Sequence, residues 1–206
     1  MPLLLGIQDF NPVLGTRITP HPQGVYLNLS DKRLTKELWD RYYPHWQLGV
    51  QDPGRFLALL LTDKKLTLAL AESCTGGGIA NALTNQPGAS QYLQGGVVVY
   101  TPEAKTKLLG IPRDELPPGG VGPNLTLAMA ASIGSVLKAD LGLGITGALG
   151  PLSPAPDVSV GEVYIAVQGM GKSKVCKFNF CGDRQTIKTA AIDAAINFVL
   201  VCLARW

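Results

Sequence analysis

Three side chains between residues 90 and 105 are of the types that can carry out nucleophilic catalysis without a histidine. Ser90 ends the turn-forming segment Pro-Gly-Ala-Ser, Tyr100 ends the apolar run GGVVVY, and Lys105 follows five residues later. A lysine ammonium beside a tyrosine hydroxyl lowers the pKa of the phenol, and a partly desolvated lysine loses its own proton more readily. Either group could therefore be the base that activates Ser90. The alternative is a packed tyrosine at a strand end and a solvated lysine on a helix.

A glycine-rich segment, residues 72–78 (ESCTGGG), lies between a predicted strand and a predicted helix. Glycine lets a backbone approach a ligand closely, and the free amides at a helix N-terminus favour an anion. Ser73, Thr75, Gly76 and Gly77 are therefore candidates for holding a phosphate group. Because a tight turn after a buried strand also uses glycines, a purely structural role is the alternative. The segment is not a Walker A loop, which requires a lysine followed by serine or threonine.

The shortage of histidine argues against two common kinds of catalytic site. His21 and His45 are the only histidines, and both lie far in sequence from every glycine-rich turn. A Ser-His-Asp triad is therefore not expected. A zinc site is not expected either, since such sites draw on several closely spaced histidines or cysteines. The four cysteines form no CxxC pair, and a chain of this length does not need disulfides, so we expect free thiols in a reducing compartment.

The candidate residues fall within a regular alternation of strands and helices that begins near residue 66. Short apolar runs predict strands, and apolar residues at helical spacing predict helices. Strands are predicted at 66–72, 95–100, 140–146, 161–167 and 174–180, and helices at 55–61, 78–84, 102–110, 125–139 and 184–206. Thr101 and Asn124 are the expected caps of the helices at 102–110 and 125–139. This order predicts the α/β class, as a three-layer α/β/α sandwich with a mixed, mostly parallel sheet. Since such folds bind ligands at the carboxyl ends of their strands, we expect Tyr100 and Lys105 at that rim.

Residues 1–58 differ from the rest in their residue types and pattern, and they are interpreted as an appended N-terminal segment of unknown function. They hold both histidines and turn-forming pairs such as Asn11-Pro12. A short strand is expected at 25–29, and a helix is expected after Ser30-Asp31, which has the residue types of a helix cap. The predicted domain is therefore 59–206.

Composition and charge indicate a globular chain without a nucleic-acid or membrane partner. Hydrophobic residues make up 46% of the chain and charged residues 16%, which is unlike a disordered protein. The net charge of +3 comes from scattered lysines and arginines, with no dense basic run. The N-terminus lacks the basic region of a signal peptide, and no segment has the ~18 uninterrupted apolar residues of a membrane-spanning helix. We therefore expect a cytoplasmic protein.

Seven short motifs occur in the order in which the CinA C-terminal family has them, and on this basis the chain resembles that family. The motifs are AESCTGG, PGAS, GGVVVY, EAKTKLLGIP, Thr146-Gly147 at a strand end, GxVYIAV from Gly161, and GDR at 182–184. They extend over nearly all of residues 66–200. Seven ordered matches within one domain are far more specific than a single short pattern.

The resemblance implies an amidohydrolase that converts nicotinamide mononucleotide and water into nicotinate mononucleotide and ammonia. It implies Ser90 as the nucleophile, with Tyr100 and Lys105 as activating partners, and it implies no cofactor and no metal. The Ser73–Gly77 segment would hold the ribose phosphate. Thr146 and Gly147 would line the same crevice.

The resemblance also bears on Arg184 and on assembly. Arg184 is a candidate for a bidentate phosphate contact. Its alternatives are to cap a helix start or to pair with Asp183, and the sequence does not choose among the three. Since relatives are often dimers, a homodimer is expected.

The chain departs from the family pattern at three places. It has Thr101-Pro102 in place of Ser-Asn, Val121-Gly122-Pro123 in place of Val-Ser-Glu, and GPLSP at 150–154 in place of Gly-Pro-Asp-Gly-Gly. The last change removes an acidic contact. Two other functions therefore stay open: a nucleotide-binding or interaction module that has lost activity, and hydrolysis of a different amide by the same residues.

Overall fold

The chain divides into two compact units. The structure is a computed structural model, and it describes residues 2–5, 18–21, 24–28 and 53–206. One unit comprises residues 1–53 and the other residues 54–204. The boundary expected after residue 58 falls inside helix α2 (Pro53–Lys64), whose Leu57 and Leu61 are fully buried.

The first unit contains a small antiparallel sheet with the strand order β1-β3-β2. Its strands are β1 (Pro2–Leu5), β2 (Ile18–His21) and β3 (Gly24–Asn28). The strand expected at 25–29 corresponds to β3. The helix expected after Ser30-Asp31, and His45, lie outside the described residues.

The second unit is built on a five-stranded mixed sheet with the order β5-β4-β6-β7-β8. The strands are β4 (Leu68–Glu72), β5 (Leu93–Val98), β6 (Leu141–Gly147), β7 (Glu162–Gly169) and β8 (Lys172–Asn179). The first three strands in this order are parallel, while β7 runs antiparallel to β6 and forms a hairpin with β8. The carboxyl ends of β5, β4 and β6 therefore meet at one edge of the sheet.

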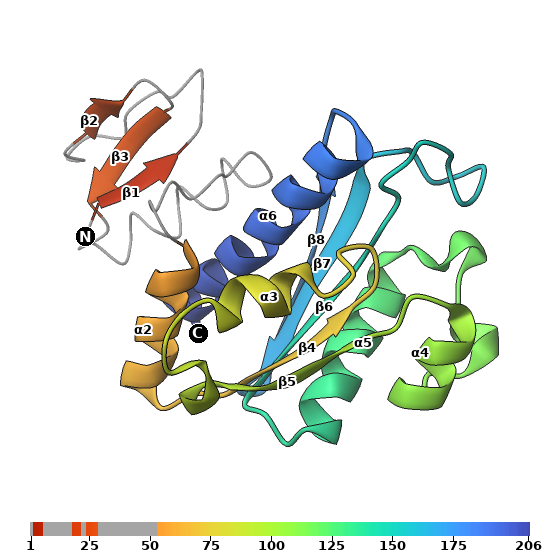
Figure 1. The fold of residues 1–206 in the computed structure, drawn as a ribbon, viewed down its shortest axis with the longest axis horizontal. Helices are drawn as coiled ribbons and strands as arrows, with labels where there is room; N and C mark the ends of the chain where they lie inside the picture. Colours follow the sequence, from red (N-terminus) through yellow and green to blue (C-terminus); the bar gives the residue numbers. More distant parts are fainter. Residues whose placement is uncertain (1, 6–17, 22–23, 29–52) are drawn as a thin grey trace. The chain divides into compact units, whose positions relative to one another are not determined.

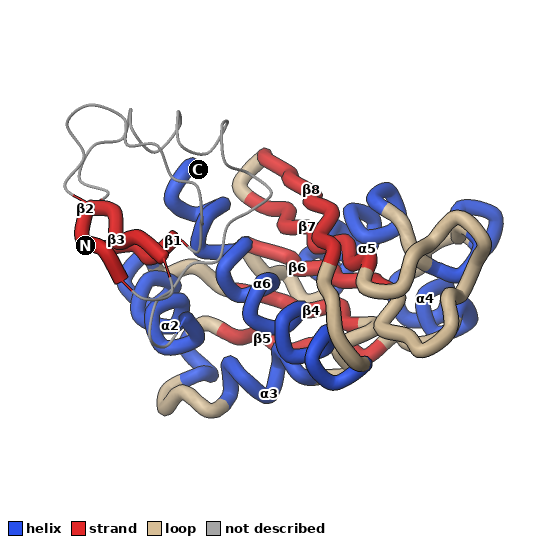
Figure 2. The backbone as a smooth tube through the Cα atoms, turned by 90° about the horizontal axis from the view of Figure 1, so that it is seen from above, coloured by secondary structure: helices blue, strands red, loops and turns tan. Residues whose placement is uncertain are grey.

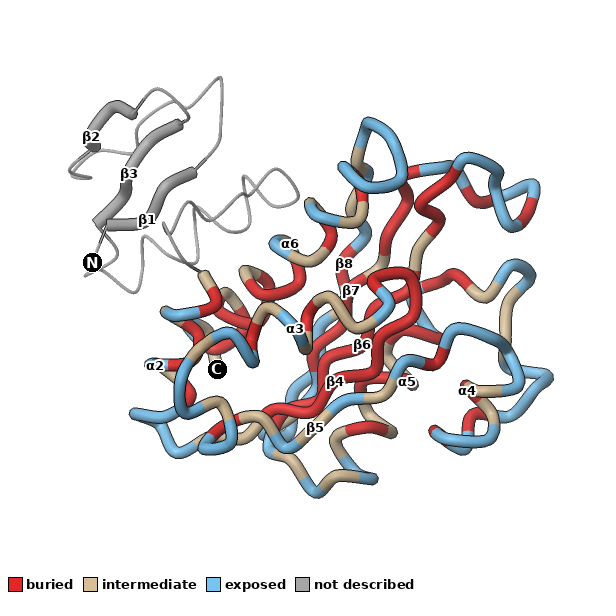
Figure 3. The backbone as a smooth tube through the Cα atoms, in the orientation of Figure 1, coloured by how far each residue is buried: buried red, intermediate tan, exposed pale blue. Residues whose placement is uncertain are grey.

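Helices cover both faces of this sheet, as the three-layer prediction requires. Helices α3 (Gly78–Thr84) and α6 (Arg184–Arg205) lie over one face, and α4 (Pro102–Leu109) and α5 (Pro123–Val136) lie on the other side (Figures 1 and 2). Every residue of β4 is buried, as a central strand covered on both faces must be (Figure 3). The predicted fold class is confirmed.

Two glycines of β6 allow α5 to lie directly on the sheet. A Cβ atom added at Gly142 would lie 1.9 Å from the Ala130 carbonyl oxygen, and one added at Gly144 would lie 2.4 Å from the Thr126 carbonyl oxygen. Only a residue without a side chain fits at these positions. The close contact fixes the start of α5 and the loop before it, which lines a crevice at the edge of the sheet.

The helix starts agree with the sequence in one case and differ in another. The Thr101 hydroxyl accepts a hydrogen bond from the Ala104 amide at 3.2 Å, so Thr101 caps α4 as its residue type predicts. Helix α5 instead begins at Pro123 after Gly122, and no side chain caps it. Asn124, the expected cap, lies inside the helix because proline is well suited to the first helical position.

Helix α6 is long and apolar enough to cross a membrane by length and composition, alone among the helices of the described ranges. Of the 18-residue apolar stretch of this helix, 61% is buried within the protein. The apolar side chains of α6 pack against the sheet, as those of a core helix do.

Candidate active site

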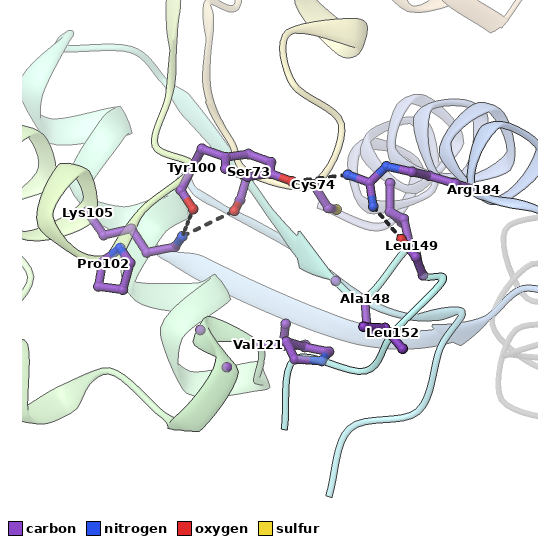
Figure 4. A pocket seen from close by; sticks show the side chains of 15 residues that line it. Ser73, Cys74, Tyr100, Pro102, Lys105, Val121, Ala148, Leu149, Leu152 and Arg184 are labelled. Carbon is purple, nitrogen blue, oxygen red and sulfur yellow. Dashed lines mark hydrogen bonds between the residues drawn. The ribbon is translucent and has the colours of Figure 1, made fainter. Parts of the chain in front are cut away.

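A crevice of about 270 Å³ opens at the edge where the parallel strands end (Figure 4). Ser73 and Cys74 follow β4, Tyr100 follows β5, and residues 147–150 end and follow β6. The volume is near the lower end of the roughly 300–1,000 Å³ usual for ligand sites. The crevice lies where parallel α/β sheets bind ligands.

Lys105 is the most deeply buried charged group of this crevice. Its Nζ lies 3.1 Å from Ser73 Oγ and 3.5 Å from the Tyr100 carbonyl oxygen (Figure 4). It also lies 2.8 Å from the Val99 carbonyl oxygen. The residue is only 2% exposed. Desolvation disfavours the charged ammonium, so burial lowers the pKa of Lys105 from its ordinary value.

The parallel pairing of β4 and β5 brings Ser73 and Lys105 together. Ser73 is the first residue after β4, and the amide of Val99, the first residue after β5, donates to the Glu72 carbonyl at 2.8 Å. Lys105 lies one turn into α4, the helix that follows β5. Both side chains therefore reach the same point from neighbouring strand ends.

Ser90 does not share this crevice. It lies in the short 3₁₀ helix Ala89–Gln91, which precedes β5, and it is exposed. Lys105 follows the six-residue strand at its other end, a separation of roughly 20 Å at ~3.3 Å per residue. The expectation that Ser90 and Lys105 exchange a proton is therefore wrong, and Ser73 is the serine at hydrogen-bond distance from Lys105.

Tyr100 and Arg184 meet at the crevice, but not as the sequence suggested. The Tyr100 phenol accepts a hydrogen bond from Arg184 Nη2 at 3.0 Å (Figure 4). Lys105 contacts the backbone carbonyl of Tyr100 and not its phenol. Arg184 Nη1 donates to the Gly150 carbonyl at 2.6 Å. Asp183 caps α6 by accepting from the Thr186 amide at 2.7 Å, so Arg184 is neither the cap nor bonded to Asp183.

The turn after β4 is not an open phosphate cradle, because a buried carboxylate already occupies it. Glu72 is 2% exposed, and it accepts hydrogen bonds from the amides of Gly77, Ile79 and Ala80 at 2.8–3.1 Å. These are the amides at the start of α3 that an anion would otherwise bind. The prediction that this helix start holds the substrate phosphate is therefore wrong.

The remaining residues expected in this cradle lie apart from the crevice. Thr75 is fully buried, and its hydroxyl has no hydrogen-bond partner. Gly76 and Gly77 adopt positive φ angles of 62° and 93°, which glycine allows, and neither lines the crevice. Of the four candidates in the turn, only Ser73 lines it.

Replacing Glu72 with glutamine should destabilise the domain by about 1–3 kcal/mol, the cost of leaving buried donors unsatisfied. The glutamine amide group would present N–H donors to backbone N–H donors of α3. Urea unfolding followed by circular dichroism measures the loss in the free energy of unfolding. Glu115→Gln, at an exposed position, is the matched control and should change it by less than about 0.5 kcal/mol. An equal effect of both changes would contradict this role of Glu72.

Thr146 and Gly147 were expected to line the crevice together, and the structure separates them. Thr146 is fully buried, and its hydroxyl lies 2.8 Å from that of Thr126 on α5. Gly147 lines the crevice with the residues that follow it. Thr146 therefore joins β6 to α5, while Gly147 keeps its expected position.

Cys74, beside Ser73 in the crevice, is a poor nucleophile. Burial raises the pKa of the Cys74 thiol to about 12, and the nearby backbone amides of residues 74 and 75 and the Lys105 charge lower it by less. A thiol with this pKa stays protonated near neutral pH, whereas the thiolate is the reactive form. Cys74, Cys176, Cys181 and Cys202 form no disulfide with one another.

Lys188 is a charged residue over the turn after β4 that was not predicted from the sequence. It lies one helical turn after Arg184, so both cations share one face of α6. A Cβ atom at Gly76 would lie 3.5 Å from Lys188 Nζ, which places the ammonium over the turn after β4. The spacing of residues 184 and 188 on a predicted helix was the available signal.

Comparisons with known proteins agree on one family. The model of the CinA C-terminal domain matches residues 52–203. A CinA-like protein of Citrifermentans bemidjiense is 41% identical over 144 residues, which are 69% of this chain and 35% of the relative. A CinA-like protein of Syntrophotalea carbinolica is 42% identical over the same length, again 35% of the relative. The chain thus spans about a third of the length of these curated relatives.

Solved structures give the same result for the fold. A competence-damaged protein (CinA) superfamily member from Escherichia coli aligns with a TM-score of 0.73 and 28% identity, over 76% of this chain and 94% of that chain. The competence/damage inducible protein CihA from Agrobacterium tumefaciens aligns with a TM-score of 0.70 and 29% identity, over 73% and 93% of the two chains.

Proposed function

The chain belongs to the CinA C-terminal domain family, and from this premise we propose that it is an amidohydrolase in which Ser73 attacks a carboxamide and Lys105 accepts the serine proton. The observation that carries the proposal is the 3.1 Å contact between Ser73 Oγ and a buried lysine in a crevice at the strand ends. A serine is a weak nucleophile at its ordinary pKa, so it needs an adjacent base. A lysine with a lowered pKa is such a base.

The hydrogen bonds of Lys105 support its action as a base. A neutral amine has two N–H groups and one lone pair. The carbonyl oxygens of Val99 and Tyr100 lie where they accept the two N–H groups. The lone pair is then left for the Ser73 hydroxyl proton.

The reaction proceeds through an acyl-enzyme. Ser73 Oγ forms a bond to the carboxamide carbon as its proton passes to Lys105, which gives a tetrahedral oxyanion. The carbon–nitrogen bond then breaks, and the Lys105 proton moves to the departing nitrogen, which leaves as ammonia. Water, deprotonated by Lys105, hydrolyses the ester and returns Ser73 to its starting state. Backbone amides of the loops that line the crevice stabilise the oxyanion.

Nicotinamide mononucleotide is the substrate that this site supports best. Its carboxamide lies at Ser73, and its phosphate lies toward Arg184 and Lys188, which supply two positive charges on one face of α6. The Tyr100 phenol accepts a hydrogen bond from Arg184, so its own proton remains available to the substrate. The products are nicotinate mononucleotide and ammonia.

Incubation of the purified protein with nicotinamide mononucleotide tests the proposal. We expect one equivalent each of ammonia and nicotinate mononucleotide, measured by a coupled ammonia assay and by chromatography. A protein that releases no ammonia, while nicotinamide mononucleotide still raises its melting temperature, would instead be a binding module of the same fold.

Replacing Arg184 with alanine should raise KM for nicotinamide mononucleotide about tenfold or more, since hydrogen bonds to charged groups contribute about 1.5–3 kcal/mol. The riboside of nicotinamide lacks the phosphate, so its KM should change much less. Initial rates with both substrates measure the difference. The two KM changes are compared as a ratio, because general damage to the site would raise both KM values by the same factor.

Arg113→Ala is the matched control for this experiment. Arg113 is an exposed arginine that pairs with Glu103, and it does not line the crevice. Its replacement should leave both KM values unchanged. Equal KM increases for the nucleotide and the riboside in Arg184→Ala would reject the phosphate contact.

A further inference from the structure

Four glycines are among the described residues that line the crevice, and one of them has room for a side chain. At the other three, an added Cβ atom would lie 3.1 Å or less from another residue: Gly119, Gly147 and Gly150. At Gly120, the nearest atom beyond the chain neighbours is Lys105 Nζ, which would lie 4.0 Å from the added Cβ. This is an ordinary van der Waals distance. A methyl-sized space therefore lies open beside the proposed base.

The backbone of residues 119–121 forms the wall of the crevice beside Lys105, and its own contacts hold it in place. The Gly120 amide donates to the Pro117 carbonyl at 2.9 Å. Val121 is buried in an apolar cluster with residues of the loop after β6. Because such packing resists displacement, the wall does not move into the space beside Gly120.

The other partners of Lys105 leave the side of this wall to the substrate. Lys105 Nζ contacts the Ser73 hydroxyl and two backbone carbonyls that follow β5. In Figure 4, Val121 of the wall lies across the crevice from Ser73. A nitrogen that leaves the carbon attacked by Ser73 must lie within hydrogen-bond reach of Nζ to receive its proton. Its substituents would then point toward the space beside Gly120.

We propose that Gly120 determines the leaving-group specificity of this site, because the space beside it admits a methyl group on the departing nitrogen. The inference rests on the proposed function, since it takes the carboxamide to lie at Ser73. The substrate class is thereby extended from the primary carboxamide to the N-methyl carboxamide of the same nucleotide.

The N-methyl amide reacts by the same steps as the primary amide. Ser73 Oγ forms a bond to the carboxamide carbon while its proton passes to Lys105. The carbon–nitrogen bond then breaks, and the Lys105 proton moves to the nitrogen, which leaves as methylamine. Water hydrolyses the remaining ester to nicotinate mononucleotide.

Three amides of the mononucleotide measure the size of the space in the wild-type protein: the primary, the N-methyl and the N-tert-butyl carboxamide. The released amine is quantified by chromatography. We expect release of both ammonia and methylamine. The tert-butyl amide should have a kcat/KM lower than that of the methyl amide by about tenfold or more, the usual effect of one carbon too many in a pocket.

Gly120→Ala places a methyl group of the protein in this space. The ratio of kcat/KM for the N-methyl amide to kcat/KM for the primary amide should therefore fall by about tenfold or more. Gly110→Ala is the matched control, because Gly110 has a φ of 68° and Gly120 has a φ of 65°, so alanine is similarly strained at both. A Cβ atom at Gly110 meets nothing within 4 Å, and Gly110 does not line the crevice. Its replacement should leave the ratio unchanged.

The outcomes separate this inference from the proposed reaction. Ammonia release without methylamine release by the wild-type protein would overturn the inference and leave the amidase standing, as would equal kcat/KM values for the methyl and tert-butyl amides. A ratio that changes equally in the two glycine variants, or in neither, would reject the role of Gly120. If Gly120→Ala does not fold, the wild-type series decides alone. If the wild-type protein releases neither amine, the proposed reaction fails and the wider substrate range fails with it.

Discussion

Replacing Ser73 with alanine should reduce the rate of ammonia release about a thousandfold or more, because the acyl-enzyme cannot form without its hydroxyl. Ser73 Oγ is the hydroxyl 3.1 Å from the buried amine of Lys105. Removing it leaves a small space and a lysine that still bonds to the carbonyl of Val99. The fold should therefore persist, and the loss should lie in kcat rather than in KM. Single-turnover measurement of nicotinate mononucleotide checks both parameters.

Ser90→Ala is the matched control, since it is the same chemical change at the serine that the family resemblance implied. Ser90 is exposed and precedes β5, so its replacement should alter the rate by less than about twofold. The opposite pattern, a lost rate in Ser90→Ala and a retained rate in Ser73→Ala, would reject the Ser73 mechanism.

The position of the site was predictable from the order of elements in the sequence. Tyr100 and Lys105 follow an apolar strand, and parallel strands of an α/β sheet present their carboxyl ends at one edge. The structure places both residues in the crevice at that edge. Even the shift of β5 by two residues, to 93–98, leaves Tyr100 in the loop just after the strand. The alternation of strands and helices predicts the position of the site because it determines the topology of the sheet, and the topology determines which strand ends share an edge.

Closeness in the sequence to Tyr100 and Lys105 does not identify the serine that contacts Lys105. Ser90 is ten residues before Tyr100, whereas Ser73 is 27 residues before it. A strand lies between Ser90 and Lys105 and carries the chain across the sheet. Ser73 and Lys105 both follow strands, and β4 and β5 are neighbours. The same rule that located Lys105 would have favoured Ser73, had it been applied to every polar residue after a strand.

The phosphate prediction failed for a reason that lies in side-chain packing. Glycines after a strand and before a helix are shared by anion sites and by turns. Here Glu72, five to eight residues before its partners, folds back onto the amides of α3. A carboxylate at the last position of a buried strand is costly unless it is satisfied, and the helix start satisfies it. The sequence contained this signal in the E of ESCTGGG.

Replacing Lys105 with methionine or arginine should reduce kcat about a thousandfold, within the ~10²–10⁴ range of general acid–base catalysis. Methionine fills a similar volume but cannot take a proton. Arginine keeps the positive charge but stays protonated, since its pKa lies far above neutral pH. A role as a base therefore predicts that both variants fail. A role as a mere positive charge predicts that the arginine variant retains activity, and thermal unfolding monitors that each variant is folded.

The direction in which kcat/KM of the wild-type protein changes with pH shows whether Lys105 acts as a neutral base or as a protonated group. Lys105 acts when neutral, so kcat/KM should rise with pH as the ammonium loses its proton. Desolvation lowers the pKa of Lys105, so the rise should level off below its ordinary value of 10.5. Below that pKa, protonation of Lys105 should lower kcat/KM about tenfold for each pH unit. Tyr100→Phe should leave this part of the pH profile at the same pH, because Lys105 contacts the Tyr100 carbonyl rather than its phenol. A rate that falls as pH rises through this range would mean that the protonated lysine is the active form, and the proton transfer from Ser73 would have to be assigned to another group.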